Sequence, residues 1–256
     1  MKTSAKKIGR ILIALTVLSA SGLLGLSQST VIDSGTLIIQ IPGGDHLGVE
    51  SFALQELSRG RLLLTSTSSL TLPGQSDPVI QSQILTLSKD FIPQSYSLHK
   101  RTLGQEAQDI GVTFQDNVAM ISIKTGNTIQ QKTIKGTDEI VLLDGNMVSQ
   151  WMLILERMQQ LQTEQANFTA LIPQLLSSFT LNVVKNREKA ILQSGDRVVQ
   201  ADQWTLKGQL TPNLALSLLL FSINGSFVAA QQLEPNPVIV FRQVVFPDGF
   251  KVEGAQ

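Results

Sequence analysis

The chain has 256 residues, and its 20 Lys and Arg residues balance its 20 Asp and Glu residues, so the formal net charge is zero. It has no cysteine, which excludes disulfides and thiolate metal sites, and no basic run with interleaved aromatics, which argues against nucleic-acid binding. Only 16% of the residues are charged, and Ser, Thr and Val abound, a composition typical of an extracytoplasmic β protein.

The chain begins with a segment that has the pattern of an export signal. Four basic residues, the last of them Arg10, precede an apolar run over residues 11–26, and polar residues follow. The run is shorter than the roughly twenty apolar residues of a full membrane span. We predict that residues 1–30 are a signal peptide, cleaved near Ala20, or else an uncleaved N-terminal membrane anchor. Either predicts that the rest of the chain lies in the periplasm, in the cell envelope or outside the cell.

Short stretches with strand character follow. Apolar and polar residues alternate within them, and turn residues such as Pro42-Gly43-Gly44 separate them, which predicts an antiparallel meander. The expected strands are residues 36–41, 48–57, 61–72, 78–88, 95–100, 108–115, 118–124 and 128–134.

Residues 144–162 break this pattern and have the period of an amphipathic helix. The apolar stripe consists of Met147, Trp151, Ile154, Leu155, Met158 and Leu161. Asp144 or Asn146 is expected to cap the start of the helix.

After Pro173 the strand pattern returns, and Asn224-Gly225 is a strong hairpin signal. The expected strands are residues 178–184, 189–194, 197–210, 214–223, 226–234 and 238–246. We predict a mainly β fold: an antiparallel meander that forms a curved sheet, or an open or partial barrel, around one amphipathic helix. Residues 31–256 then form a single β-rich domain, with the alternative of two meanders (33–136 and 174–250) joined by helix 144–162.

Three segments of the second half carry a resemblance to a known group of proteins: GDRVVQADQWTL, LSLLLFSINGSFVAAQQL and RQVVFPDGF. Together with the signal segment and the helix between two meanders, they resemble exported bacterial proteins of unknown function whose sheets curve like the Lol-type lipoprotein carriers. The resemblance covers most of residues 33–250. It implies an apolar concavity and a lipid or lipoprotein-like ligand. The chain departs from the carriers in having one helix where they use several.

The sequence has no recognisable catalytic or metal-binding motif. Its two histidines, His46 and His99, are far apart and lack the spacing of metal ligands. There is no G-x-S-x-G motif for a serine nucleophile. Acids cluster at residues 138–144, and Glu50 and Glu56 share a strand, but the sequence does not bring any pair together. We therefore expect no cofactor, no metal and no enzymatic activity.

The leading functional hypothesis is a non-enzymatic envelope protein that binds a hydrophobic molecule or an envelope partner on the inner face of the sheet. The residues predicted to form that surface are Leu62, Leu64, Phe114, Trp151, Leu218, Leu220 and Phe241. The alternatives are a membrane-anchored structural or interaction module, and a hydrolase with a non-standard site.

Overall fold

A computed structural model of the chain describes residues 29–136, 139–145, 147–247 and 249–252. The signal or anchor segment predicted for residues 1–30 therefore lies almost entirely outside the described residues, and Asn146 lies outside them too.

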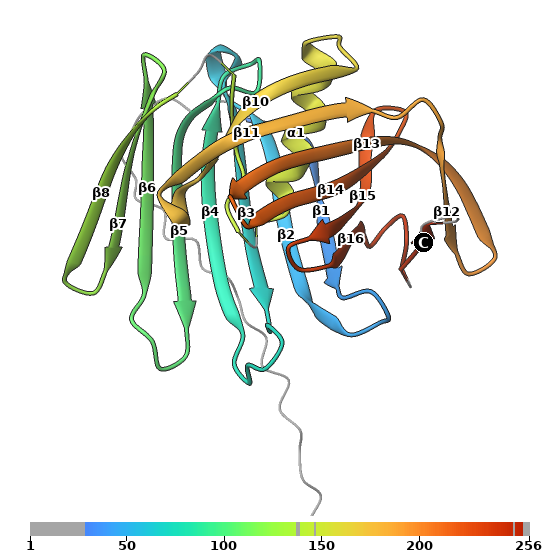
Figure 1. Cartoon of the computed structure of the whole chain (residues 1–256), viewed down its shortest axis with the longest axis horizontal. Coiled ribbons are helices and arrows are strands. Elements are labelled where there is room, and N and C mark those ends of the chain that lie inside the picture. The colour runs from blue at the N-terminus through green and yellow to red at the C-terminus, as the bar shows by residue number, and fades with distance from the viewer. Residues whose placement is uncertain (1–28, 137–138, 146, 248, 253–256) are drawn as a thin grey trace, which may run out of the picture.

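Strands dominate the structure, and one α-helix interrupts them (Figure 1). The first half contains β1 (Thr30–Gln40), β2 (His46–Glu56), β3 (Leu62–Leu70), β4 (Val79–Leu87), β5 (Pro93–Thr102), β6 (Gln108–Gln115), β7 (Val118–Thr125), β8 (Thr128–Lys135) and β9 (Ile140–Leu142). The second half contains α1 (Ser149–Gln160), β10 (Gln165–Ile172), β11 (Ser177–Lys185), β12 (Ala190–Ser194), β13 (Arg197–Thr211), β14 (Leu214–Ile223), β15 (Ser226–Glu234), β16 (Val238–Arg242) and β17 (Lys251–Val252). Short 3₁₀ turns occupy Ser58–Gly60 and Pro173–Leu175.

The strands form one hydrogen-bonded sheet that does not close into a barrel. From β2 to β8 each strand pairs antiparallel with the next, and β1 joins this meander to the second one by pairing with β2 on one side and β16 on the other. The path then runs through β15, β14, β13, β11 and β10 to β9, which is parallel to β10. Within the described residues, β8 pairs only with β7 and β9 only with β10, so no backbone pairing between these two end strands closes the sheet.

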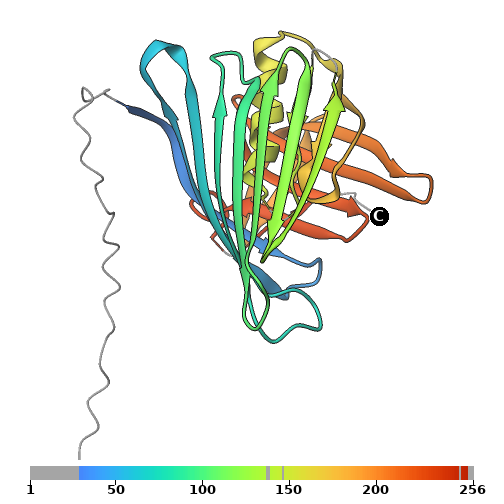
Figure 2. The ribbon, with the colours of Figure 1, turned by 90° about the vertical axis from the view of Figure 1, so that its left-hand side faces the viewer.

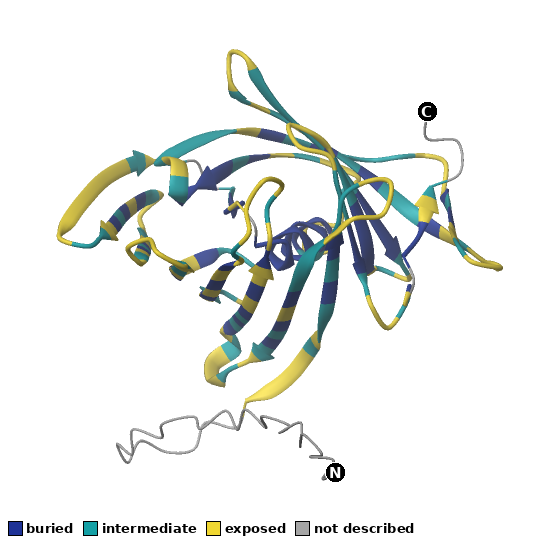
Figure 3. Ribbon diagram, turned by 90° about the horizontal axis from the view of Figure 1, so that it is seen from below, coloured by how far each residue is buried: buried dark blue, intermediate teal, exposed yellow. Residues whose placement is uncertain are grey.

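The helix lies between the two halves of the sheet (Figure 2). Successive residues of a strand point to opposite faces, so most strands of the first meander bury every second side chain on the face turned toward α1, as the alternating colours of Figure 3 show, whereas β8 is exposed on both faces. On β4, for example, Gln83, Leu85 and Leu87 are buried while Ile84 is exposed. The main core is therefore the space enclosed by the inner faces of both halves and filled by α1.

A second, smaller core lies on the other face of β14–β16. Its centre is Phe250, whose ring lies 5.9 Å from that of Phe221, 6.1 Å from that of Phe241 and 5.3 Å from that of Phe246. Residues of β12 and β13 complete the cluster. The C-terminal segment therefore covers this face of the second meander.

The predicted fold class is confirmed: the chain is mainly β, with an open curved sheet around one helix. Several element bounds differ from the prediction. The helix begins at Ser149 rather than near residue 144, the predicted strand 238–246 ends at Arg242, and β9 and β10 form in stretches with no predicted strand. Among the described residues, no helix has the length and apolar character needed to span a membrane.

Candidate functional site

The seven residues predicted to form an apolar binding surface lie in the two cores. Six of them belong to the main core or pack against it: Leu62, Leu64, Phe114, Trp151, Leu218 and Leu220. Phe241 lies in the second core instead, because it points to the opposite face of β16 from its neighbour Val240. The structure therefore brings six of the seven together around α1. Ligand binding by these residues stays a prediction.

Phe114 also lines a small open hollow. The hollow has a volume of about 190 Å³, and its other apolar lining residues are Ile92, Pro93, Val118 and Ile140. It lies where the β6–β7 turn approaches β9. Of the seven predicted residues, Phe114 is therefore one that borders open space as well as the core.

A buried polar cluster holds the N-terminal end of α1 against the sheet. The residue at the cap position, Val148, provides no side-chain hydrogen bond to the helix. Instead, Glu50 of β2 accepts hydrogen bonds at Oε2 from the backbone N–H groups of Val148 (2.7 Å) and Ser149 (3.3 Å). The hydroxyl of Ser149 donates to Oε1 of the same carboxylate. A carboxylate from another element thus caps the helix, and of the two predicted caps Asp144 lies before the helix start while Asn146 lies outside the described residues.

Gln83 of β4 extends this cluster across the sheet. Its Nε2 donates to the hydroxyls of Ser66 (2.8 Å) and Ser149 (2.9 Å), and its Oε1 accepts from Nε2 of Gln150 (2.7 Å). Each of these side chains is buried. We call Glu50, Ser66, Gln83, Ser149 and Gln150 the helix seat, because their mutual bonds fix α1 on β2–β4.

Asp144 lies just before the helix and is linked to the helix seat. Its backbone N–H donates to Oε1 of Gln150 (2.6 Å), and the hydroxyl of Tyr96 donates to its Oδ2 (2.6 Å). Burial raises the pKa of Asp144 to about 6, although the Tyr96 hydrogen bond opposes the shift. Burial also raises the pKa of Glu50 and, aided by the Asp144 charge, that of Tyr96.

Some buried polar atoms at this place have no hydrogen-bond partner among the described residues. They are Oδ1 of Asp144 and both amide atoms of Gln81, which is the β4 neighbour of Ser68 on β3. Two of the acids singled out in the sequence, Glu50 and Asp144, thus serve the same helix end. Both acids are buried, and their hydrogen bonds position the start of α1.

The outer face of the sheet carries a different polar group. Nδ1 of His99 on β5 lies 2.6 Å from Oδ1 of Asp109 on β6, and the cross-strand neighbour of His99 on its other side is Ser82 of β4. The Ser82 hydroxyl interacts with that of Thr67 at 3.3 Å, and all four residues are exposed. A serine hydrolase needs a serine activated by the base and a site that stabilises the oxyanion. Among the described residues, the Ser82 hydroxyl interacts with Thr67, and no hydrogen bond joins it to His99. No group of three metal-ligating side chains gathers within the described ranges.

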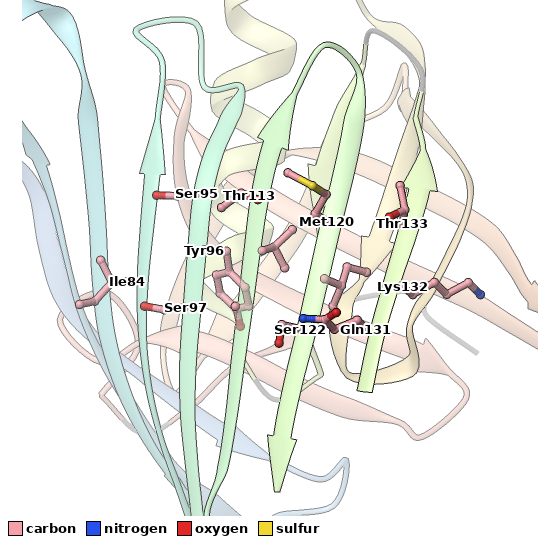
Figure 4. Close-up of a pocket in the computed structure, with 13 residues that line it drawn as sticks. Ile84, Ser95, Tyr96, Ser97, Thr113, Met120, Ser122, Gln131, Lys132 and Thr133 are labelled. Carbon is pink, nitrogen blue, oxygen red and sulfur yellow. The ribbon is translucent and has the colours of Figure 1, made fainter. Parts of the chain in front are cut away.

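An open groove crosses the outer face of β4–β8, on the side turned away from α1 (Figure 4). Its volume is about 580 Å³. Two adjacent cross-strand rows form its floor: one runs Ile84, Ser97, Gly111, Ser122, Gln131, and the other runs Ser95, Thr113, Met120, Thr133. We call this the outer groove. Small side chains make it shallow, and Ile84 and Met120 leave 53% and 46% of their surface exposed in it.

The groove ends at β8, whose second edge has no backbone partner among the described residues. The N–H of Gly136 donates to the carbonyl of Asn117 at 2.6 Å, so these two residues are a hydrogen-bonded pair between β7 and β8. Hydrogen-bonded and non-hydrogen-bonded pairs alternate along an antiparallel ladder, so the backbone groups of residues 130, 132 and 134 also bond to β7. The N–H and C=O groups of Ile129, Gln131, Thr133 and Lys135 therefore point outward. We call this row the β8 edge.

The comparisons with known proteins support the fold and no more. No protein-family model matches the chain, and no curated protein matches it. Among solved structures, it is similar to a protein from Brucella abortus described as a beta-barrel-like protein of a domain of unknown function, DUF1849. The TM-score is 0.54 at 8% identity, over 91% of this chain and 100% of that one. A DUF1089 family protein from Pseudomonas aeruginosa matches with a TM-score of 0.41 at 10% identity, over 83% of this chain and 94% of that one.

Proposed function

We propose that this protein is a non-enzymatic binding protein of the cell envelope, which holds an extended segment of a partner polypeptide along the β8 edge. The proposal develops one arm of the hypothesis drawn from the sequence, an envelope partner, and places the contact on the sheet edge rather than on its inner face. The observation that carries it is the row of four outward-facing backbone positions on β8.

Strand addition needs a regular edge with accessible backbone groups, and β8 provides one. Its eight residues contain no proline, and every one except Ile134 is exposed. A peptide placed there gains main-chain hydrogen bonds along its length, while neighbouring pockets select its side chains. The outer groove lies beside the edge, since Gln131 and Thr133 belong to both. A regular edge without proline that neither a helix nor a loop of the described residues pairs with is a candidate binding surface for a strand whose charges match its own.

Amide hydrogen exchange tests this proposal. The purified protein is mixed with a panel of eight-residue extended peptides of acidic, neutral and basic composition. We expect at least one of them to slow exchange at Ile129, Gln131, Thr133 and Lys135, while Gln130 and Lys132, already bonded to β7, change little. Failure of the whole panel to protect these four amides would contradict strand addition.

A matched pair of variants separates the backbone from the side chain. Gln131→Pro removes one outward N–H and leaves the bonds to β7 in place, which an edge strand tolerates. Gln131→Ala keeps the N–H. We expect the proline variant to lose the protection and the alanine variant to keep it.

A second candidate is the binding of a hydrophobic molecule, the other arm of the sequence hypothesis. The hollow lined by Phe114, Ile92 and Val118 favours this function, because its apolar lining is open to solvent and includes Phe114, a residue predicted to bind the ligand. Native mass spectrometry of the protein purified from its source membrane fraction tests it. This function is supported if a lipid remains bound to the natural chain and is absent from the variant Phe114→Asp. A natural chain that carries no lipid contradicts it.

A further inference from the structure

We infer that the partner segment is acidic, with two carboxylates three residues apart, one on each face of the added strand. This inference rests on the proposed strand addition at the β8 edge and specifies its occupant. The relevant charges are those of the β7–β8 hairpin. Residues 118–135 contain Lys124, Lys132 and Lys135 and no Asp or Glu.

None of these three lysines takes part in an ion pair among the described residues. Lys124 has an acid as its cross-strand neighbour, Asp109, whereas Lys132 and Lys135 have none. The lining of the outer groove contains no acid. Acids occur at the ends of the hairpin: the Glu106 carboxylate lies against Gly126, and Asp116 sits in the β6–β7 turn. The middle of the edge is therefore positive.

The spacing of Lys132 and Lys135 sets the spacing in the partner. Residues three apart in a strand point to opposite faces, and Lys135 shares the outer face with Thr133 while Lys132 points to the inner one. Cross-strand neighbours point to the same side, so an added strand places one carboxylate opposite each lysine only if its acids are also three residues apart. Acids two residues apart would reach only one lysine.

The same charges disfavour a second copy of this chain as the occupant. Two antiparallel registers give the longest pairing of β8 with itself. One places the Lys132 side chains directly opposite each other, and the other places them diagonally. Like charges in these positions destabilise a strand pair. An acidic segment of another chain meets no such penalty.

Fluorescence anisotropy with labelled eight-residue peptides tests the inference. The probe is a threonine, valine and serine strand with glutamates at its third and sixth positions, and the controls carry lysines at those positions or glutamates two residues apart. We expect the probe to bind about tenfold more tightly than the lysine peptide and more tightly than the respaced one at low salt. The preference should shrink at about 1 M salt, where the Debye length is about 3 Å.

Charge reversal on the protein provides the matched test. The double variant Lys132→Glu, Lys135→Glu should invert the order, so that the lysine peptide binds more tightly, while Lys124→Glu should change it far less. Equal binding of all peptides, with the four edge amides still protected, would overturn the acidic preference and leave strand addition intact. Binding by no peptide, together with unprotected amides, would overturn both, and would identify the lysines as protection of an exposed edge.

Discussion

Glu50 is the residue on which the seating of the helix depends most directly. Its carboxylate accepts two backbone N–H groups and one hydroxyl at the start of α1, and it is fully buried. Glu50→Ala leaves these donors buried without an acceptor, which we expect to lower the free energy of unfolding by about 2–4 kcal/mol. Urea denaturation measures this.

Glu56→Ala is the control for that variant. Glu56 lies at the end of the same strand and is exposed, so its loss should change the free energy of unfolding by less than about 0.5 kcal/mol. Equal stability of the two variants would contradict the helix-seat interpretation.

Asp144 makes the stability depend on pH. The pKa of its carboxyl is about 6 in the folded protein, against 3.8 ordinarily, because burial disfavours the charged form. Above pH 6 the folded state holds an ionised carboxylate at a cost. As the pH falls from 7 toward 4, the folded state takes up this proton before the unfolded state does. The free energy of unfolding should therefore rise toward acid, by up to about 3 kcal/mol from this residue.

The raised pKa of Glu50 also makes the free energy of unfolding rise toward acid pH. Asp144→Asn removes the contribution of Asp144. The free energy of unfolding of this variant, measured with denaturant, should therefore depend less on pH than that of the natural chain. Identical profiles would show that Asp144 titrates normally.

Within the elements, Gly48 marks a close approach of two strands. It lies on β2 opposite Leu70 of β3, with φ +157°, and a Cβ at this position would lie 2.0 Å from the carbonyl oxygen of Ser69. Because that atom belongs to the backbone, Gly48→Ala forces the strands apart. We expect it to lower the free energy of unfolding by more than about 2 kcal/mol, measured by thermal or urea unfolding.

Gly111 provides the matched substitution. It lies on β6 in the same sheet, and a Cβ there would meet no atom within 4 Å. Gly111→Ala should leave the stability within about 0.5 kcal/mol of the natural value. A similar loss at both glycines would mean that Gly48 matters through chain flexibility and not through contact.

The sequence predicts most elements because half-buried strands alternate visibly, as Leu62, Leu64, Leu85 and Leu87 do on β3 and β4. It places the start of the helix wrongly, because the capping group comes from Glu50, about a hundred residues away in the sequence, and no local pattern reveals it. It misses β10 because Ala170, Leu171 and Ile172 are all buried. A strand buried on both faces loses its alternation.

For the whole molecule, the open end of the sheet determines how copies of the chain meet. We expect the natural chain to be monomeric, because Lys132 opposes pairing of β8 with a second β8. The double variant Lys132→Thr, Lys135→Thr removes that repulsion and should form dimers as its concentration rises, which light scattering detects. Lys124→Thr, one strand further in, should stay monomeric. A double variant that also stays monomeric would show that something other than charge protects the edge.

The candidate site could be predicted from the sequence only in part. The apolar inner-face residues follow from alternation, and they lie in the cores as that pattern implies. The free edge of β8 could not be predicted from the sequence, because it depends on which strand is last in the sheet. The pattern of turns and polar residues in β8 is the same as that of a strand with two neighbours. Long-range pairing of β1 with β16 decides which ends remain open.

Isotope-filtered NOE spectroscopy of the labelled protein with the two-glutamate peptide tests the central claim most directly. The account predicts cross-strand contacts between the peptide backbone and the β8 edge at Gln131 and Thr133, with peptide side chains over Met120 in the outer groove. Contacts to Trp151 or to Leu218 instead would place the ligand inside the sheet and contradict the account.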